Sequence, residues 1–193
     1  MINLARMEVF EAISGRRTVK AFTGPALTAD ELEPLFDAAR WAPNHKLTEP
    51  WRFRVLGETS RNALKIAAAG VAAAHAPEGA DEKLIGAVAA KKLDRAPTLV
   101  AVSCVRNADP VLEAEDFAAT AIASYIVLLA AHANGFAGYW RTPEVLRDNA
   151  GTEALGIGPE EDVLGLLHLG RPDGALPAAP KRAAPASFVS YLD

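Results

Sequence analysis

Residues 117–134, FAATAIASYIVLLAAHAN, form the longest apolar stretch of the chain, and they decide how the rest of it is interpreted. They lie within a helical pattern over residues 111–134, which Gly135 ends, and no Asp, Glu, Lys or Arg occurs over residues 117–140. A membrane span is one interpretation of such a run. The stretch is largely alanine, includes hydroxyl side chains and lacks flanking basic anchors. We therefore predict a buried helix, either central in the core or at a dimer interface.

The composition describes one globular domain over residues 1–193, with 50% hydrophobic and 23% charged residues. The net charge of -4 gives no general attraction for nucleic acid or an anionic membrane, so neither is predicted as a partner. Cys104 is the only cysteine, which excludes an internal disulfide and a thiolate metal site. The stretch Met1–Glu8 has no long apolar core after a basic start, so we predict a cytoplasmic protein.

Helical and strand patterns lie on both sides of the apolar stretch. Helices are predicted at residues 7–14, where Gly15 is the terminator, at residues 28–41, and at residues 60–74 and 82–94. Thr28 and Glu31 form a capping box, and Thr142 is predicted to cap a further helix with Pro143 at its first position. Strands are predicted at residues 51–56, 98–105, 136–140, 162–169 and 188–192. Residues 170–185, rich in Pro, Ala and Gly, predict an extended surface arm suited to pack on another subunit.

A basic stretch lies just after the first helix. Residues 13–22, ISGRRTVKAF, contain Arg16, Arg17 and Lys20 together with the hydroxyl of Thr18. Guanidinium groups present a planar fork of donors that suits phosphate. The pattern therefore indicates an anion site, while a solvated basic turn is the alternative.

Two further clusters of polar residues lie beside strands. Pro43, Asn44, His45 and Glu49 lie in the loop before the strand that begins at Trp51, an unusual density of polar groups for a plain connection.

The other cluster is Gly138-Tyr139-Trp140-Arg141-Thr142, at a strand-to-helix junction where Arg141 and free backbone N–H groups could meet an anion. The alternative places Trp140 in the core and Arg141 in a surface ion pair.

Several common catalytic motifs are absent. Residues 156–161, GIGPEE, have Glu where a dinucleotide fingerprint needs its third Gly, and no strand pattern precedes them. The sequence has no phosphate-binding loop of the GxxxxGK[ST] type and no GxSxG motif. The four histidines show no metal-ligand spacing, and no metal site is predicted. His132 and His168 are interpreted as hydrogen-bonded core residues and His75 as a loop residue, which leaves His45 as the one histidine among other polar groups.

Taken together, the three clusters resemble the FMN-dependent nitroreductase family in their order and spacing. The segments that carry the resemblance are RRTVKAF at 16–22, WAPNHK at 41–46, EPWRF at 49–53, GYWRT at 138–142 and LGRP at 169–172, followed by Lys181 and Arg182. The similarity spans nearly the whole chain. It is strongest to the short bacterial NAD(P)H nitroreductases.

The resemblance implies an α+β fold with a mixed, mainly antiparallel sheet wrapped by helices. It also implies an intertwined homodimer, in which an arm of about residues 171–193 packs on the partner chain and two FMN molecules lie in the interface. The long helix and the detached tail would both be explained by this arrangement.

The resemblance also assigns residues to the cofactor. Arg16, Arg17 and Thr18 would hold the phosphate and ribityl chain, and Lys20 would lie near the N1 and O2 edge of the flavin, where a cation stabilises the charge of the reduced ring. The other implied FMN contacts are Pro43, Asn44 and His45 from the partner chain, Trp140, Arg141 and Thr142, and Arg182 or Lys181. Residues 132–135 are a weaker candidate for the nicotinamide cofactor.

The implied activity is ping-pong hydride transfer from NADPH or NADH through FMN to an electron-poor small molecule, such as a nitroaromatic or a quinone. No protein nucleophile is needed, and protons would come from solvent or from His45. The alternatives are a flavin-binding module or sensor with little turnover, and a specialised desaturase, dehalogenase or flavin-cleaving enzyme. The chain departs from many members at Asn44-His45-Lys46 and Glu49 and lacks room for the helical insertion of longer relatives, so its substrate does not follow from the resemblance.

Overall fold

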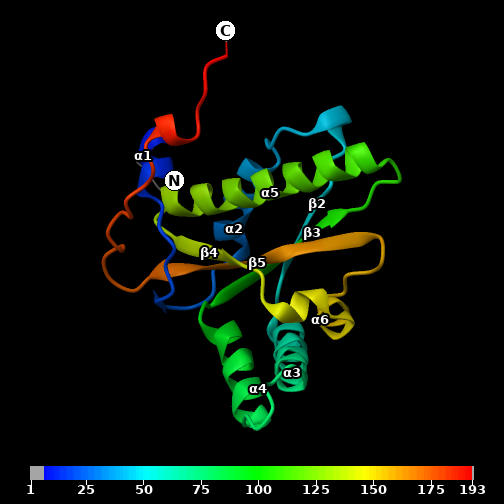
Figure 1. The fold of residues 1–193 in the computed structure, drawn as a ribbon. Coiled ribbons are helices and arrows are strands. Elements are labelled where there is room, and N and C mark those ends of the chain that lie inside the picture. The colour runs from blue at the N-terminus through cyan, green and yellow to red at the C-terminus, as the bar shows by residue number, and fades with distance from the viewer. Residues whose placement is uncertain (1–6, 193) are drawn as a thin grey trace.

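A five-stranded sheet forms the centre of the computed structural model, which describes residues 7–192 (Figure 1). Its longest strand, β5 (Glu161–Pro172), pairs with β3 (Thr98–Val105), with β4 (Ala137–Arg141) and, through its last two residues, with β1 (Phe22–Thr23). Strand β2 (Trp51–Val55) pairs with β3 and forms the edge of the sheet. Every named strand pair is antiparallel, and a single bridge between Thr18 and Gly138 is parallel. The predicted mixed, mainly antiparallel sheet is thus confirmed.

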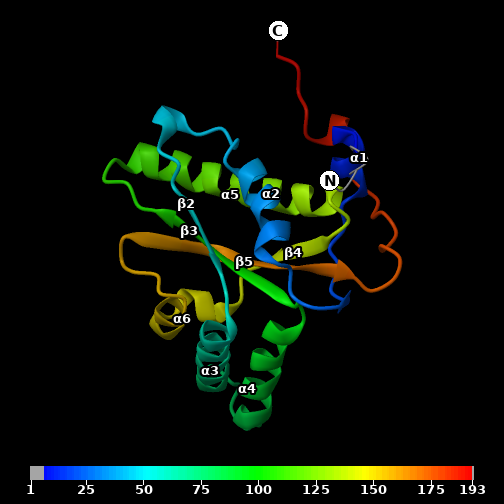
Figure 2. The same ribbon diagram turned by 180° about the vertical axis from the view of Figure 1, so that it is seen from behind.

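Helices cover both faces of this sheet. Figures 1 and 2 show α5 and α2 on one face and α3, α4 and α6 on the other. The helices and 3-10 turns are α1 (Val9–Gly15), α2 (Ala29–Ala39), η1 (His45–Leu47), α3 (Glu58–Ala74), α4 (Glu82–Lys91), η2 (Lys92–Asp94), α5 (Pro110–Ala133), η3 (Glu144–Arg147), α6 (Asn149–Ala154) and η4 (Pro185–Ser187).

Because the sheet is covered twice, the protein has two hydrophobic cores. Along β3, Val100 and Val102 contribute to the core beneath α5 and α2, whereas Leu99 and Ala101 contribute to the core beneath α3 and η3. Successive residues of a strand point to opposite faces. This explains why residues 98–105 form a continuous apolar run and not an alternating one.

The long helix α5 lies across the sheet with its ends well defined. The Asp109 side chain accepts a hydrogen bond from the Val111 N–H at the start, and Gly135, with φ +78°, follows the end. The Phe136 N–H then bonds the Ala131 carbonyl and the Gly135 N–H bonds the His132 carbonyl, which is a Schellman motif. By length and composition alone α5 could cross a membrane, with a mean hydropathy of 1.5, but it packs on the sheet as a core helix does.

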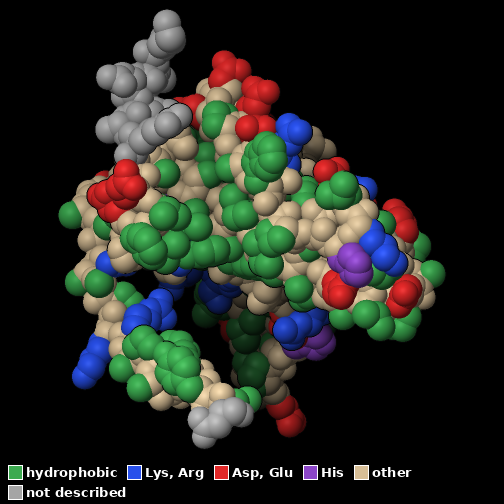
Figure 3. Space-filling model, turned by 90° about the horizontal axis from the view of Figure 1, so that it is seen from above, with side chains coloured by type: hydrophobic (Ala, Val, Ile, Leu, Met, Phe, Trp, Pro, Cys, Tyr) green, Lys and Arg blue, Asp and Glu red, His purple; other side chains and the backbone are tan. Residues whose placement is uncertain are grey.

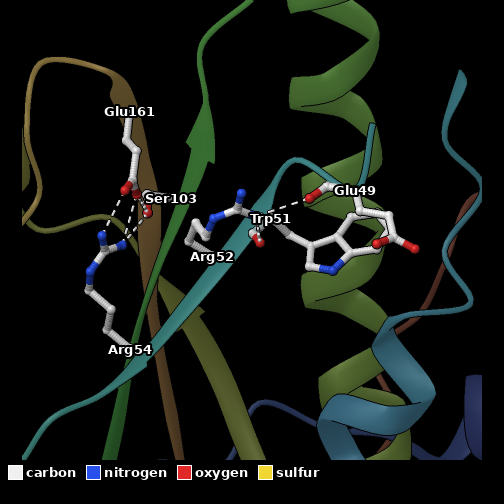
Figure 4. A network of polar contacts seen from close by, with 6 residues as sticks. All are labelled: Glu49, Trp51, Arg52, Arg54, Ser103 and Glu161. Atoms are coloured by element: carbon white, nitrogen blue, oxygen red, sulfur yellow. Dashed lines mark hydrogen bonds and ion pairs between the residues drawn. The ribbon is translucent and has the colours of Figure 1, made fainter. Parts of the chain in front are cut away.

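A polar network of Arg54, Ser103 and Glu161 joins the strands β2, β3 and β5 (Figure 4). Arg54 on β2 donates two hydrogen bonds to Glu161 on β5, at 2.7 and 2.8 Å, across the intervening Ser103 of β3. The Ser103 hydroxyl also donates to Glu161 and accepts from Arg54. The Arg54 hydrogen bonds hold the pKa of Glu161 below its ordinary value, against the opposing effect of burial.

Three local predictions were wrong. Residues 188–192 form no strand. They follow η4 as an exposed irregular tail, because a strand needs a neighbour and none of residues 7–192 pairs with the tail. The turn after β4 begins at Glu144 with Pro143, in an extended conformation, at its N-cap, so Thr142 caps nothing. Gly15 lies inside α1, and Arg16 is the C-cap.

Candidate functional site

Arg16 and Arg17 lie in the wall of a hollow that we name the outer hollow. It has a volume of about 720 Å³ and lies between the end of α1, the middle of α5 and the C-terminal arm. Figure 3 shows basic side chains around the gap between this arm and the body. Its wall is formed by Ile13, Ser14, Arg16, Arg17, Thr18, Tyr125, residues 177–180 and Arg182. Three of the predicted cations thus meet there, whereas Lys181 does not line it.

The two arginines of the outer hollow are held differently. The guanidinium of Arg16 lies 5.6 Å from the centre of the Tyr125 ring, a cation–π contact with α5. Arg17 donates from one Nη to the carbonyls of Ser14 and Arg16, at 2.6 and 2.9 Å. The Nε of each arginine is buried and has no hydrogen-bond partner among the described residues. Within the described chain, both Nε donors are therefore buried without the partner that a buried donor normally has.

Gly15 matters here for its small size. A Cβ on Gly15 would lie 2.9 Å from Nε2 of His132, so only glycine lets α1 approach α5 this closely. Burial and the charges of Arg16 and Arg17 lower the pKa of His132, which keeps this imidazole neutral beside the arginine pair.

Thr18 connects the outer hollow to a second one, the inner hollow, of about 430 Å³. Val19 is buried, so the extended segment 18–20 turns Thr18 and Lys20 to the opposite, exposed side. Thr18 bridges to Gly138 of β4, where a Cβ would lie 2.6 Å from the His168 carbonyl oxygen. The full wall of the inner hollow is Thr18, Lys20, Lys92, Arg95, Tyr139, Trp140 and Arg141.

Burial perturbs the polar groups of the inner hollow. Burial lowers the pKa of Arg141, and its Nη1 has no partner among residues 7–192. The alternative interpretation of Arg141 as a surface ion pair is therefore wrong for the described chain. Burial also raises the pKa of Tyr139, whose buried hydroxyl likewise lacks a partner within the described residues. Unpaired buried donors are costly, so a cluster of them indicates a ligand site.

Trp140 packs against the core beneath α5 and α2, as the alternative interpretation placed it, although the residue also borders the inner hollow. Its Nε1 donates to the Leu164 carbonyl at 3.3 Å, and a Cβ on Gly165 would lie 2.1 Å from the same nitrogen. Glycine at position 165 is therefore required for this placement of the indole.

His168 is fully buried beneath Tyr139. The two rings stack with centroids 4.4 Å apart, and burial, aided by Arg141, Arg61 and Arg95, lowers the pKa of His168 to about 3. Neither ring nitrogen has a hydrogen-bond partner in the part of the chain that the structure describes. The prediction of a core histidine is confirmed, but the prediction that it is hydrogen-bonded is wrong.

The loop of Pro43, Asn44 and His45 lies elsewhere. His45 Nδ1 lies 2.7 Å from a carboxylate oxygen of Glu115, and the Thr48 hydroxyl donates to the buried Asp116 at 2.5 Å. Both acids belong to the first half of α5, whereas Gly15 meets His132 near its end. At the rise of an α-helix, the two contact points are about 25 Å apart. A single chain therefore does not bring this loop to the hollows.

The structure adds four residues that the sequence analysis did not single out: Lys92, Arg95, Tyr125 and Tyr139. Lys92 and Arg95 follow the end of α4 and carry no motif of their own. Tyr139 belongs to the cluster at residues 138–142, in which the sequence assigned a binding role to Trp140, Arg141 and Thr142 and none to Tyr139. Thr142 is exposed and lines neither hollow. Within residues 7–192, no cluster of His, Cys, Asp and Glu is suited to a metal ion.

The arrangement can bind an elongated anion with a flat end. Arginine forks and a threonine hydroxyl at the outer hollow suit a phosphate. The inner hollow adds Lys20, Lys92, Arg95 and Arg141, with Tyr139 in the same wall. Such a wall suits a planar group that carries negative charge.

Comparisons with known proteins identify the family of this chain. The Nitroreductase family model matches residues 13–171. The chain is 31% identical over 190 residues to the Escherichia coli strain K12 protein named "Putative NAD(P)H nitroreductase YdjA", covering 96% of this chain and 100% of that protein. It is similar in structure to a nitroreductase-like family protein from Bacillus cereus, with a TM-score of 0.83, 25% identity and 96% coverage of both chains.

A further structural relative is the FMN-dependent nitroreductase NfnB from Mycobacterium smegmatis, whose structure is a complex with NADPH. The TM-score is 0.72 at 18% identity, with 95% of this chain and 97% of that chain covered. The family model covers far more than half of this chain, and the similarity to YdjA covers 96% of this chain and the whole length of YdjA. The chain belongs to the nitroreductase family.

Proposed function

We propose that the protein is an FMN-dependent NAD(P)H oxidoreductase that reduces electron-poor small molecules such as nitroaromatics or quinones. The observation that carries this proposal is the pair of joined hollows, in which buried guanidinium nitrogens of Arg16, Arg17 and Arg141 lack partners among the described residues. The relatives named as NAD(P)H-dependent or FMN-dependent nitroreductases support it.

The outer hollow is the proposed place of the FMN phosphate. Arg16, Arg17 and Arg182 supply positive charge, and Thr18 supplies a hydroxyl donor at the junction of the two hollows. Charge-assisted hydrogen bonds to phosphate are among the stronger ones in proteins. The Arg16 contact with Tyr125 keeps the guanidinium in place before the ligand arrives.

The inner hollow is the proposed place of the flavin ring. FMN supplies the hydride chemistry when it is bound. The chain would orient the ring and stabilise its negative charge, because Lys20, Lys92 and Arg95 would surround the electron-rich edge of the ring with positive charge. Trp140 and Arg141 would border the ring, while Thr142 follows them on the surface.

The site would be completed by a second copy of the chain. Pro43, Asn44 and His45 lie at the other end of α5, so a partner related by two-fold symmetry could carry its loop to these hollows. Hydrophobic side chains gather on the face shown in Figure 3, which supports such a homodimer. The exposed apolar side chains of α1 and α5 include Val9, Phe10, Val111, Phe117 and Ile122. The exposed tail, from about residue 171 onward, would pack on the partner (Figure 1).

The net reaction for a nitroaromatic would be R–NO2 + NADPH + H+ giving R–NO + NADP+ + H2O. The proton can come from solvent. His45, exposed and paired with Glu115, is the titratable side chain that the partner's loop would add.

The test is the addition of NADPH to the purified protein without oxygen. The proposal expects a yellow dimer whose flavin absorbance bleaches within seconds and returns when a quinone is added. NADH is added in parallel to establish the preferred cofactor. A flavin that stays oxidised with both nucleotides would instead support a binding module or sensor.

A further inference from the structure

A third hollow, the lateral hollow, lies beside the inner hollow and has a volume of about 460 Å³. It lies between the α3–α4 hairpin and η3. Its wall is formed mainly by apolar side chains, among them Val71, Leu84, Ile85, Val88 and Val145. Its size is within the range of pockets that hold small molecules.

The apolar wall is unusually exposed for side chains of this type. Leu84 is 61% exposed and Val88 is 45% exposed, although both belong to a helix that packs against α3. Exposed apolar side chains that border a hollow indicate a binding groove more strongly than scattered ones do.

The lateral hollow is continuous with the inner hollow. Lys92 and Arg141 line both, so the two hollows meet at these side chains. The Nη1 of Arg141, at this junction, has no hydrogen-bond partner among the described residues. The lateral hollow has one carboxylate in its wall, Glu144, which lies 2.8 Å from Nδ1 of His75.

We propose that the lateral hollow is the subsite for the apolar body of the electron acceptor, whose oxygen-bearing reducible group lies at the junction against Arg141 and Lys92. The proposal rests on the reductase function proposed above and names its substrate class: flat acceptors of more than one ring, with a nitro or quinone oxygen at one end. Nitro and carbonyl oxygens accept hydrogen bonds and gain negative charge during reduction, which guanidinium and ammonium groups stabilise.

The subsite is tested with two ligand pairs on the holoprotein. Biphenyl-4-carboxylate and benzoate are not reducible, and their binding is measured by calorimetry. 4-Nitrobiphenyl and nitrobenzene are their reducible counterparts, and for these KM and kcat are measured. The long member of each pair is expected to bind more tightly, because only it reaches the lateral hollow.

Two variants change the subsite and one serves as a control. Ala72→Trp fills the lateral hollow and Leu84→Ser removes part of its wall, while Ile66→Ser changes an exposed side chain of α3 that does not line it. Both subsite variants should lower the affinity for biphenyl-4-carboxylate about tenfold and raise KM for 4-nitrobiphenyl by a similar factor. The kcat for 4-nitrobiphenyl, the affinity for benzoate and the KM for nitrobenzene should stay unchanged. Ile66→Ser should match the parent protein.

The outcomes separate this inference from the proposed function. Binding of biphenyl-4-carboxylate that depends on the lateral hollow would uphold the subsite even if no nitro compound is reduced. Active reduction with equal affinity for long and short ligands, unaffected by Leu84→Ser, would overturn the subsite and leave the reductase function intact. Because Leu84 is largely exposed, its variant should fold even if Ala72→Trp does not.

Discussion

At the scale of a single residue, Arg16 makes one contact within the described chain and keeps one donor unpaired there. Its side chain lies over the Tyr125 ring, and its buried Nε has no partner among the described residues. A guanidinium held in this way is preorganised for an anion, since it loses little freedom when the ligand binds.

Replacing Arg16 with alanine should therefore cost FMN affinity. A hydrogen bond to a charged group is worth about 1.5 to 3 kcal/mol, so Arg16→Ala should purify substantially without flavin. The ratio of flavin to protein absorbance measures this. Arg40→Ala is the matched control, because Arg40 is an exposed arginine that pairs with Asp37 on α2. Full flavin content in Arg16→Ala would show that the phosphate lies elsewhere.

At the scale of elements, β2, β3 and β5 are joined by side chains as well as by backbone. Arg54, Ser103 and Glu161 form one polar network across the three strands, and the side chain of Glu161 is only 8% exposed (Figure 4). Losing the Arg54–Glu161 pair should cost more stability than losing an exposed ion pair, because water cannot easily take the place of the missing partner at a buried carboxylate.

Glu161→Gln should lower the free energy of unfolding by about 2 kcal/mol at pH 7, since it removes the charge that two Arg54 hydrogen bonds require. The folded pKa of Glu161 is lowered, so its stabilising contribution is present above the ordinary pKa of 4.5 and is lost as pH falls through the folded value. Urea unfolding at pH 7 and at successively lower pH should show the variant and parent curves converging in acid.

Asp37→Asn is the control for this element. It removes a carboxylate from a pair whose side chains are both more than 60% exposed, at 66% for Arg40 and 63% for Asp37. Exposed pairs contribute about 0 to 1 kcal/mol, so its effect should be small. An equal loss in both variants would mean that the Glu161 network has no special role.

At the scale of the whole molecule, the C-terminal arm leaves the body of its own chain. Tyr191 and Leu192 are 95% and 92% exposed, which is unusual for two large apolar side chains at the end of one tail. If the arm packs on a partner, these side chains are buried in the dimer and exposed only in the isolated chain.

The double variant Tyr191→Ser with Leu192→Ser should weaken the dimer by on the order of 6 kcal/mol, because a symmetric dimer would bury four such side chains, two from each arm. Light scattering during gel filtration at decreasing protein concentration measures this. Ile66→Ser on α3 is the control, because it removes an apolar side chain from the opposite side of the sheet (Figure 1). If the double variant and the parent dissociate at the same concentration, the arm does not contribute to the dimer.

The sequence predicted those parts of the fold that depend on local patterns. The capping box of Thr28 and Glu31 forms as expected, and Gly135 ends α5 because a left-handed residue is needed there. The apolar run of β3 correctly indicated a strand buried on both faces. The failed strand at residues 188–192 has the composition of a strand but no pairing neighbour in the described part of its own chain.

The sequence by itself determined most of the helices and strands, the family and the basic stretch around Arg16, because caps, periodicity and motifs are properties of neighbouring residues. Only the tertiary structure brought Lys92 and Arg95 from the end of α4 to Thr18 and Arg141, since strand pairing and helix packing decide which distant segments meet. It also placed the loop of His45 at the other end of α5, away from these cations. The rigid length of that helix is the physical reason that one chain holds only part of the proposed site.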